Sequence, residues 1–348
     1  MKVMEKSPIY FGLPPLAISL PVPSDLASLS LSATVPISFI TFYLTIISYL
    51  NRVNKRRNYK AYALAKTRVF RSLVLLHNVG LACFSGWIFI RTIGTLRDEW
   101  PSRAADSYLS RAVDAACRLG RDTSPDVFPA QPTEIQFLTW VFYLSKLYEL
   151  LDSFILAAKG KHVPILQTYH HPGAIIGFWL AARDVSFPAL AAVVMNSGIH
   201  AVMYSYFAVT TLHYTPPTPL KKSITTMQLA QFFIGLAIGA CCFLLEYHLP
   251  TTGDAHNARP NMQVPSATVS MRELGMEAGL GAAAGWADPM HTTDTTDTHY
   301  VPCLRTRGQM LCVYFSSMYT VGLIVMFRSF YVRTYGLETR GAGGGLKK

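Results

Sequence analysis

The chain has 348 residues, of which 51% are hydrophobic and only 15% are charged. A soluble domain of this length needs more charged residues to cover its surface, so the composition favours a membrane protein. The net charge of +11 does not indicate nucleic acid as a partner, because the basic residues cluster beside apolar runs, as membrane anchors do.

Seven runs are long enough to cross a bilayer, which takes about 20 residues of helix. In chain order they cover residues 33–50, 69–92, 135–157, 163–182, 186–209, 224–247 and 308–331. Each run is expected to be a helix, because lipid offers backbone polar groups no other partner. The predicted fold class is therefore all-α, a polytopic membrane protein with seven transmembrane helices.

The orientation follows from the loop at 51–68, which contains many Lys and Arg and no acidic residue. A short loop with that bias stays on the cytoplasmic side, so the N-terminus is predicted to be lumenal and the C-terminus cytosolic. The chain then divides into a lumenal segment 1–32, a membrane domain 33–248 with six helices, a lumenal insertion 249–305, a seventh helix 306–333 and a cytoplasmic tail 334–348.

The insertion at 249–305 is rich in Thr, Gly, Ala, Pro and Asp, a composition that buries too little apolar surface to order itself, so most of it is predicted to be flexible. The six cysteines form no CxxC pair and show no zinc spacing. Cys117 and Cys303 fall in segments predicted to be lumenal loops, where disulfides persist. We predict that these two pair, with two free thiols as the alternative.

The first polar cluster is KLYELLDS, near the cytoplasmic end of the third span. Ionisable groups inside spans are costly and usually functional. Lys146, Glu149 and Asp152 recur every three residues, so they spread over about a third of a helix circumference. They form either a structural ion pair at a helix end or the polar wall of a substrate cavity.

The second cluster is ILQTYHHPG in the fourth span, with His170 and His171 adjacent and Gln167 one turn earlier. A lone histidine in a membrane is more often a packing group, but a pair beside a Gln and a Tyr favours a functional site. The unperturbed pKa of histidine, near ~6.5, lets one ring act as a base or nucleophile at neutral pH.

The third cluster is NSGIHAVMYSYF in the fifth span. Asn196, His200, Met203, Tyr204 and Phe207 recur at helical spacing on one stripe. The Met and aromatic members alone would indicate core packing. Asn and His on the same stripe predict that it faces the cavity of the histidine pair.

The fourth cluster is KKSITTMQLAQF, which opens the sixth span. Thr225, Gln228 and Gln231 lie three residues apart and so line one side of the helix. Lys221 and Lys222 lie at the cytoplasmic mouth. They are either ordinary membrane anchors or a site for a phosphate-bearing substrate such as coenzyme A.

In this order, KLYELLDS, QTYHH, NSGIHAVMYSY and TTMQLAQ resemble the signature blocks of the ELO family of fatty acid elongases. That family's pattern runs K-x-x-E-x-x-D-[ST], a histidine box, N-x-x-x-H-x-x-M-Y-x-Y and T-x-x-Q-x-x-Q. The resemblance covers about 135–235 by motif. It implies an endoplasmic-reticulum enzyme, a very-long-chain 3-oxoacyl-CoA synthase, that condenses acyl-CoA with malonyl-CoA and releases carbon dioxide and CoA.

The resemblance further implies helices around an apolar acyl tunnel, closed on the lumenal side and open to the cytosol. It implies no tightly bound cofactor and no metal, with acyl-CoA and malonyl-CoA as substrates. The implied partners are the lipid bilayer and the ketoreductase, dehydratase and enoyl reductase of the elongation cycle, with a homodimer as a further candidate. Gln167 stands where the box usually begins with His, which resembles the elongases that act on polyunsaturated chains.

Carried over residue by residue, the resemblance assigns catalysis to His170, His171 and His200. Our hypothesis is that His170 attacks the acyl thioester, while His200 with Asn196 orients malonyl-CoA or stabilises its enolate. Glu149 and Asp152 would orient the histidines. The residues expected to bind or orient substrate are Lys146, Glu149, Asp152, Gln167, Asn196, Tyr204, Gln228 and Gln231, with Lys221 and Lys222 for CoA.

Two other classes compete with this interpretation. A membrane di-iron desaturase or hydroxylase needs about eight histidines in three boxes, and here only His170, His171, His200 and at most His213 cluster in the sequence. A seven-helix receptor or transporter gives no reason for a histidine pair beside a carboxylate helix. His77, isolated in the second span, and His213 are predicted to be structural; no chemistry is expected of His256, His291 and His299 in the insertion.

Overall fold

The computed structural model describes residues 24–101, 108–119, 133–249 and 299–341. In chain order its helices are α1 (Ser24–Leu31), α2 (Thr34–Arg56), α3 (Arg68–Glu99), α4 (Tyr108–Arg118), α5 (Glu134–Tyr148), α6 (Leu151–Ala158), α7 (Ile165–Arg183), α8 (Phe187–Thr211), α9 (Thr218–Leu244) and α10 (Arg307–Gly341). A short 3-10 helix, η1 (Leu64–Lys66), precedes α3, and two strands, β1 (Glu246–Leu249) and β2 (His299–Pro302), lie between α9 and α10.

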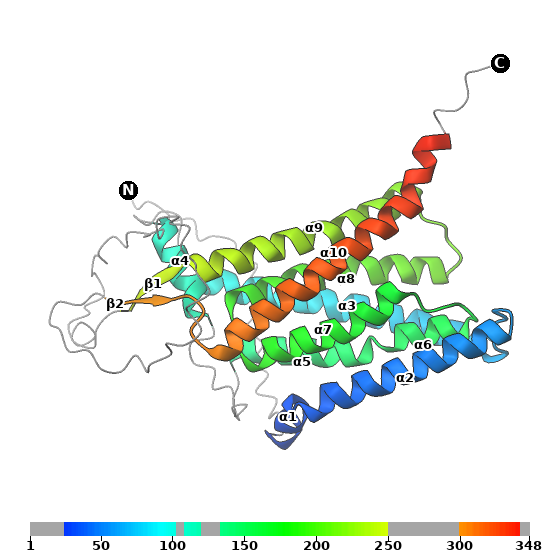
Figure 1. Ribbon diagram of the computed structural model, residues 1–348, viewed down its shortest axis with the longest axis horizontal. Helices are drawn as coiled ribbons and strands as arrows, with labels where there is room; N and C mark the ends of the chain where they lie inside the picture. The colour runs from blue at the N-terminus through cyan, green and yellow to red at the C-terminus, as the bar shows by residue number, and fades with distance from the viewer. Residues whose placement is uncertain (1–23, 102–107, 120–132, 250–298, 342–348) are drawn as a thin grey trace, which may run out of the picture.

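Within the described ranges, the helices form one bundle of seven passes: α2, α3, the pair α5 and α6, α7, α8, α9 and α10 (Figure 1). Of these, α2, α3, α8, α9 and α10 are long and apolar enough to cross a membrane. Helix α7 has 19 residues and carries the histidine pair, and α5 and α6 are two shorter helices in one pass. The predicted all-α polytopic membrane fold is confirmed.

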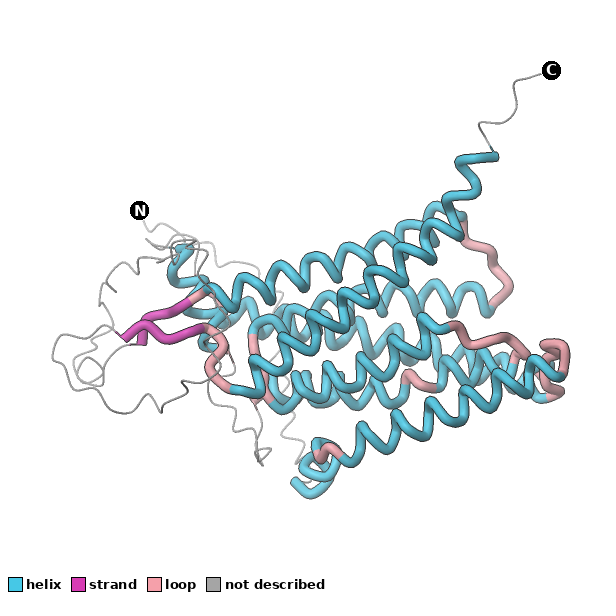
Figure 2. The backbone as a smooth tube through the Cα atoms, viewed as in Figure 1, coloured by secondary structure: helices cyan, strands magenta, loops and turns pink. Residues whose placement is uncertain are grey.

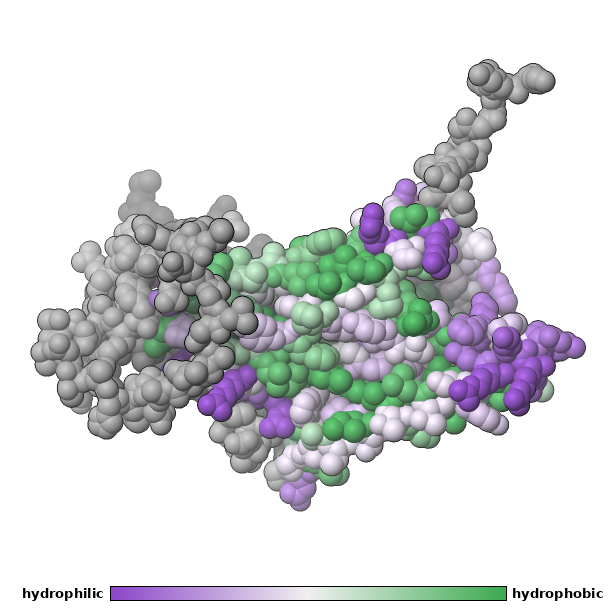
Figure 3. Space-filling view, viewed as in Figure 1, coloured by the Kyte–Doolittle hydropathy of each residue, from purple (hydrophilic) through white to green (hydrophobic). Residues whose placement is uncertain are grey.

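The two ends of the bundle differ. Short loops and the end of α10 lie at one end, and the strands β1 and β2 lie at the other (Figure 2). On the face shown in Figure 3, apolar side chains cover the middle of the bundle, and hydrophilic ones gather beyond the end of α2. Large apolar side chains such as Leu73 and Leu76 are exposed on α3. An apolar band between polar ends is the surface that a bilayer requires.

Several helices extend beyond their apolar runs. Helix α3 continues to Glu99 and α10 to Gly341, past the predicted ends at 92 and 331, so the predicted tail 334–348 begins as helix. Helix α1 also lies inside the segment 1–32, where we predicted no element. Hydropathy marks only the part of a helix that lies in hydrocarbon, so it does not report the polar turns outside.

The predicted insertion at 249–305 is bordered by paired strands. Antiparallel pairing places Tyr247 opposite Val301 and His248 opposite Tyr300. The sixth span was predicted to reach residue 247, but α9 ends at Leu244 and Leu245 is already extended. The part predicted to be flexible, 250–298, lies outside the described residues.

A disulfide joins Cys117 to Cys303, the pairing predicted from the sequence. The prediction that Cys117 lies in a loop is wrong, because it belongs to α4. Arg and Asp are interspersed with Ala and Val in that helix. Because it contains no long apolar run, the sequence predicted a loop there. Both cysteines are buried and pack with Cys242 and Val313, so the disulfide ties α4 to the segment between β2 and α10.

Candidate active site

A chamber of about 570 Å³ lies within the bundle, between α6, α7, α8 and α9. All three predicted catalytic histidines line it, one pair from α7 and one residue from α8. The whole predicted stripe of α8 and the predicted face of α9 line it as well. The members from the sequence prediction are Glu149, Asp152, Gln167, His170, His171, Asn196, His200, Met203, Tyr204, Phe207, Lys221, Thr225, Gln228 and Gln231.

A buried ion pair lies at the chamber wall, where Glu149 lines the chamber and Lys146 lies behind it. Nζ of Lys146 is 2.7 Å from Oε1 of Glu149, and each side chain is only 2% exposed. The ammonium also donates to Oδ1 of Asn196 at 2.9 Å. Because an ammonium can only donate, Asn196 presents its oxygen to Lys146 and keeps its N–H bonds for other partners. Oε2 of Glu149 lies 3.6 Å from Nδ1 of His200.

The third span bends at this ion pair instead of running as one helix over 135–157. Helix α5 ends at Tyr148, and the N–H of Asp152 donates to the carbonyl oxygen of Glu149 at 3.1 Å, which is one residue tighter than an α-helical bond. The tighter turn changes the direction in which the carboxylate of Asp152 points. Glu149 therefore faces Lys146 and His200, whereas Asp152 faces α3 and α8.

Both oxygens of Asp152 are used by neighbouring helices. Oδ1 lies 2.8 Å from Nε2 of His77 on α3, and Oδ2 accepts from the Tyr204 hydroxyl on α8 at 2.6 Å. We predicted that Asp152 orients the catalytic histidines, but its hydrogen-bond partners are His77 and Tyr204. The prediction that His77 is isolated is wrong. It is one of three ionisable residues in the second span, with Arg71 and Arg91, and the rule that flagged the other clusters applies to it as well.

We expect His77 to support activity through Asp152 and Tyr204. Replacing His77 with phenylalanine removes the donor to Asp152 and should lower kcat by roughly 10- to 100-fold, the usual effect of removing a partner that orients a functional group. His77→Gln keeps an N–H donor and should restore part of the activity. Steady-state kinetics of both variants, with protein amount normalised, give the measurement.

A double-mutant cycle distinguishes this role from simple packing. If His77 acts through Tyr204, then His77→Phe should cost little more in a Tyr204→Phe background. If the two substitutions instead lowered kcat by factors that multiply in the double variant, His77 and Tyr204 would act independently, which would contradict this role of His77. Tyr148→Phe is the matched comparison, because Tyr148 is 48% exposed and its hydroxyl meets the other ring nitrogen of His77 at 3.2 Å, and we expect a smaller loss of activity than in His77→Phe.

The two box histidines have different partners. Nδ1 of His170 lies 2.8 Å from the hydroxyl of Tyr319 on α10. Nε2 of His171 lies 3.4 Å from the amide nitrogen of Gln167 one turn earlier, and the Tyr43 ring packs edge-on against the His171 ring. Sequence reasoning did not find Tyr319, because an aromatic residue in a span is ordinarily core packing and only hydroxyl residues, with no ionisable or amide side chain, stand beside it.

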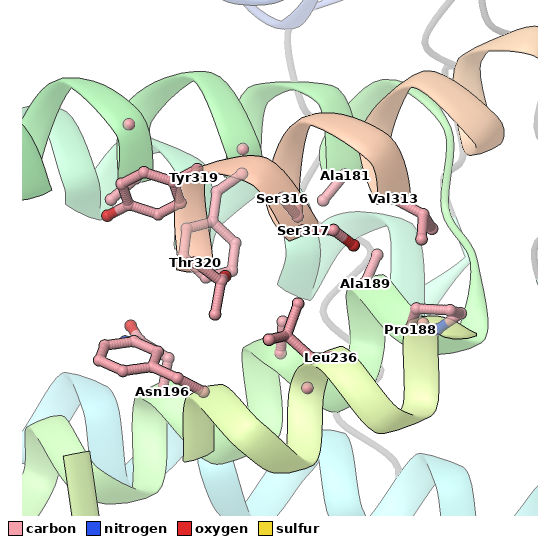
Figure 4. A pocket seen from close by; sticks show the side chains of 18 of the residues that line it. Ala181, Pro188, Ala189, Asn196, Leu236, Val313, Ser316, Ser317, Tyr319 and Thr320 are labelled. Carbon is pink, nitrogen blue, oxygen red and sulfur yellow. The ribbon is translucent and has the colours of Figure 1, made fainter. Parts of the chain in front are cut away.

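A narrower cavity of about 120 Å³ continues from the chamber between α7, α8, α9 and α10. The two spaces share His170, Asn196, Gln231 and Phe232. In Figure 4 Tyr319 and Asn196 lie at one end of this cavity, and Val313 and Pro188 lie at the other. The remaining lining is mostly small or apolar, including Gly173, Gly177, Ala181, Ala189, Ala192, Gly235 and Gly239.

Three lysines line the chamber near the loop end of the bundle: Lys159, Lys161 and Lys221. Partial burial, and to a lesser extent the positive charge of Lys161, lowers the pKa of Lys159 from its ordinary value. Lys222, also predicted at this mouth, does not line the chamber, and its ammonium lies over the Tyr331 ring at 6.0 Å. His213 is exposed in the loop after α8, outside the chamber.

The sequence model of the ELO family, GNS1/SUR4, matches residues 28–342. The chain belongs to this family. ELO membership does not favour the alternative of a di-iron desaturase or hydroxylase. In the part of the chain that the structure describes, no three His, Cys, Asp or Glu side chains form a group that could hold a metal ion.

Curated relatives of this ELO chain carry elongase names. Very long chain fatty acid elongase 6 of Drosophila melanogaster is 39% identical over 102 residues, which is 29% of this chain and 32% of the fly protein. Fatty acid elongase sre1 of Dictyostelium discoideum is 27% identical over 212 residues, 61% of this chain and 70% of that protein. The chain spans about a third of the length of the fly relative and of Putative fatty acid elongase 3 of Caenorhabditis elegans. No solved structure matches the chain.

Proposed function

We propose that this ELO protein is a fatty acid elongase that condenses an acyl-CoA with malonyl-CoA to a 3-oxoacyl-CoA two carbons longer. The observation that carries the proposal is the meeting of His170, His171 and His200 in one chamber that continues into a narrow, mostly apolar cavity. The imidazole, amide and carboxylate groups in the chamber suit the reacting thioesters, and the mostly apolar extension suits an acyl chain. The names of the relatives support the same reaction.

The first step is acyl transfer to His170. A ring nitrogen attacks the thioester carbonyl carbon, the carbon–sulfur bond breaks, and CoA leaves as a thiolate. The acyl group remains on the imidazole, which divides one difficult reaction into two easier ones. His170 suits this role because it lines both the chamber and the cavity, so the acyl chain can extend into the cavity while CoA lies toward the lysines.

The second step is condensation with malonyl-CoA. Loss of carbon dioxide leaves an electron pair as an enolate, whose carbon attacks the acyl carbonyl and releases the ring of His170. The N–H bonds of Asn196 supply donors for the enolate oxygen, because its own oxygen faces Lys146. His200 lines the same chamber and orients the thioester. The thiolate released earlier takes a proton from water, which balances the reaction.

The mouth of the chamber is proposed to face the cytosol, in the endoplasmic-reticulum membrane, with the N-terminus in the lumen. The ammonium groups of Lys159, Lys161 and Lys221 suit the phosphates of CoA. A 3-oxo product requires a ketoreductase, a dehydratase and an enoyl reductase to become a saturated chain again.

An assay with radiolabelled malonyl-CoA tests the proposal. Purified protein in lipid is incubated with a panel of saturated and polyunsaturated acyl-CoAs, and the products are separated by length and number of double bonds. We expect labelled 3-oxoacyl-CoA only when both substrates are present. Because Gln167 stands at the start of the box, we propose that polyunsaturated chains give the highest rates. No labelled product from any acyl-CoA would contradict the proposed function.

The far end of the cavity should set the acyl length. A Cβ atom added to Gly239 would lie 3.2 Å from Cγ1 of Val313, so a side chain there takes up the space in which the acyl tail would end. We expect Gly239→Ala and then Gly239→Leu to shift the products progressively toward shorter chains, by at least one two-carbon cycle, in the same assay. Gly80→Leu is the matched control, because Gly80 is exposed on α3 and has open space around it. An unchanged product profile in Gly239→Leu would contradict this placement of the tail.

A further inference from the structure

We infer that Tyr319 of α10 is a positioning residue that fixes His170 as the tautomer protonated at Nδ1 and so selects Nε2 as the atom that receives the acyl group. The inference rests on the proposed function, which supplies the acyl transfer. Its basis is a pair of contacts made by one hydroxyl. The Tyr319 oxygen lies 2.8 Å from Nδ1 of His170 and 2.9 Å from the backbone carbonyl oxygen of the same residue.

The tautomer follows from the number of protons. The Tyr319 hydroxyl has one proton, and a backbone carbonyl oxygen can only accept. When the hydroxyl donates to the carbonyl of His170, its oxygen is left as an acceptor for Nδ1, so Nδ1 must carry the ring proton. A neutral imidazole has a single N–H, and Nε2 therefore keeps its lone pair. The hydrogen bond on one ring nitrogen decides the state of the other.

Nε2 is also the nitrogen available to substrate. Within the described residues, no hydrogen bond to Nε2 of His170 is present, whereas the ring lines both the chamber and the cavity. By contrast, Nε2 of the neighbouring His171 faces Gln167 at 3.4 Å. The two adjacent histidines are therefore distinguished by their partners, and His170 alone presents a free ring nitrogen at the junction of the two spaces.

The position of Tyr319 is fixed by reciprocal packing between α7 and α10. Tyr319 lies against Gly173 so closely that a Cβ atom there would overlap its ring, and Tyr169 lies against Gly322 in the same way. The two tyrosine rings stack with their centroids 5.5 Å apart, and the Tyr169 hydroxyl donates to the Tyr319 carbonyl oxygen at 3.3 Å. Glycine is needed at both places because any side chain would displace the opposing tyrosine.

The acylation step uses this arrangement directly. As Nε2 attacks the thioester, its lone pair forms the new bond to carbon, and the carbon–sulfur pair leaves on CoA. The ring keeps its proton on Nδ1 and becomes a positively charged acyl-imidazolium, whose N–H points at the Tyr319 oxygen. Attack by the enolate later returns the pair to Nε2 and restores the same tautomer. Without Tyr319, the ring can take the other tautomer, in which Nε2 is protonated and cannot attack.

Tyr319→Phe tests the inference, because it keeps the stacked ring and removes only the hydroxyl. We expect the release of CoA from acyl-CoA, measured in the absence of malonyl-CoA, to slow by roughly 10- to 100-fold, while KM for acyl-CoA stays close to the native value. Tyr169→Phe is the matched control from the same stack, and its hydroxyl does not touch His170. We expect Tyr169→Phe to release CoA at nearly the native rate.

Nitrogen-15 NMR of histidine-labelled protein in lipid reports the tautomer without any turnover. His170 is assigned by the signals lost in His170→Gln. We expect a protonated Nδ1 and an unprotonated Nε2 in the native chain and in Tyr169→Phe, and a change at both nitrogens in Tyr319→Phe. A native His170 protonated at Nε2, or a native rate of CoA release in Tyr319→Phe, would overturn the inference. Failure of the proposed function looks different: the expected tautomer would be present, but acyl-CoA would release no CoA.

Discussion

Replacing His170 with alanine is expected to slow condensation by at least about a thousandfold, because the variant lacks the atom that we propose as the acceptor of the acyl group. His171 should not substitute for it, since its Nε2 faces Gln167 and lies away from the junction of chamber and cavity. The loss should be in kcat, with the acyl cavity left intact. The rate of labelled 3-oxoacyl-CoA formation by purified protein gives the measurement.

Mass spectrometry of the protein mixed with acyl-CoA alone adds a second test. The native chain should gain the mass of one acyl group on the peptide that contains His170, and His170→Ala should gain none. His213→Ala is the matched control, because His213 is exposed in the loop after α8 and has no place in the chamber. Full condensation by His170→Ala, or an acyl group mapped to another residue, would refute the assignment of His170 as the nucleophile.

The sequence predicted the parts of this site that one helix determines. The stripe that starts at Asn196 and His200 follows from the helical repeat of α8, and the face that contains Gln228 follows from α9 in the same way. Both face the chamber. Polar side chains in apolar helices were a sufficient signal, because lipid makes each of them costly unless it faces a cavity or a partner.

The contacts between helices could not be predicted in this way. The contact between Tyr319 and His170 joins residues 149 positions apart, and no local pattern brings α10 beside α7. The break at Glu149 also escaped detection, because its residues are compatible with a continuous helix and only the tertiary partners of Asp152 favour the tighter turn. Lys221 lines the chamber and Lys222 does not, because adjacent lysines point to different sides of a helix.

Replacing Lys146 with methionine is expected to lower the free energy of unfolding by about 3 to 5 kcal/mol, because Glu149 would remain charged in a site that is 2% exposed after losing its nearest cation. Thermal unfolding in detergent, followed with a thiol-reactive dye, gives the measurement. The buried thiols of Cys242 and Cys312 become accessible only as the bundle opens. A native melting temperature in this variant would contradict the importance of the pair.

The double variant Lys146→Met, Glu149→Gln distinguishes the two interpretations of the cluster KLYELLDS, a structural ion pair or the polar wall of a substrate cavity. Replacing both members removes the unpaired charge, so most of the lost stability should return. Activity should stay low, because Asn196 loses the ammonium that fixes its amide and His200 loses the carboxylate 3.6 Å from its Nδ1. If activity returned together with stability, Lys146 and Glu149 would be only a structural ion pair. Stability without activity would place them in the catalytic apparatus, as the residues that orient the groups facing the chamber.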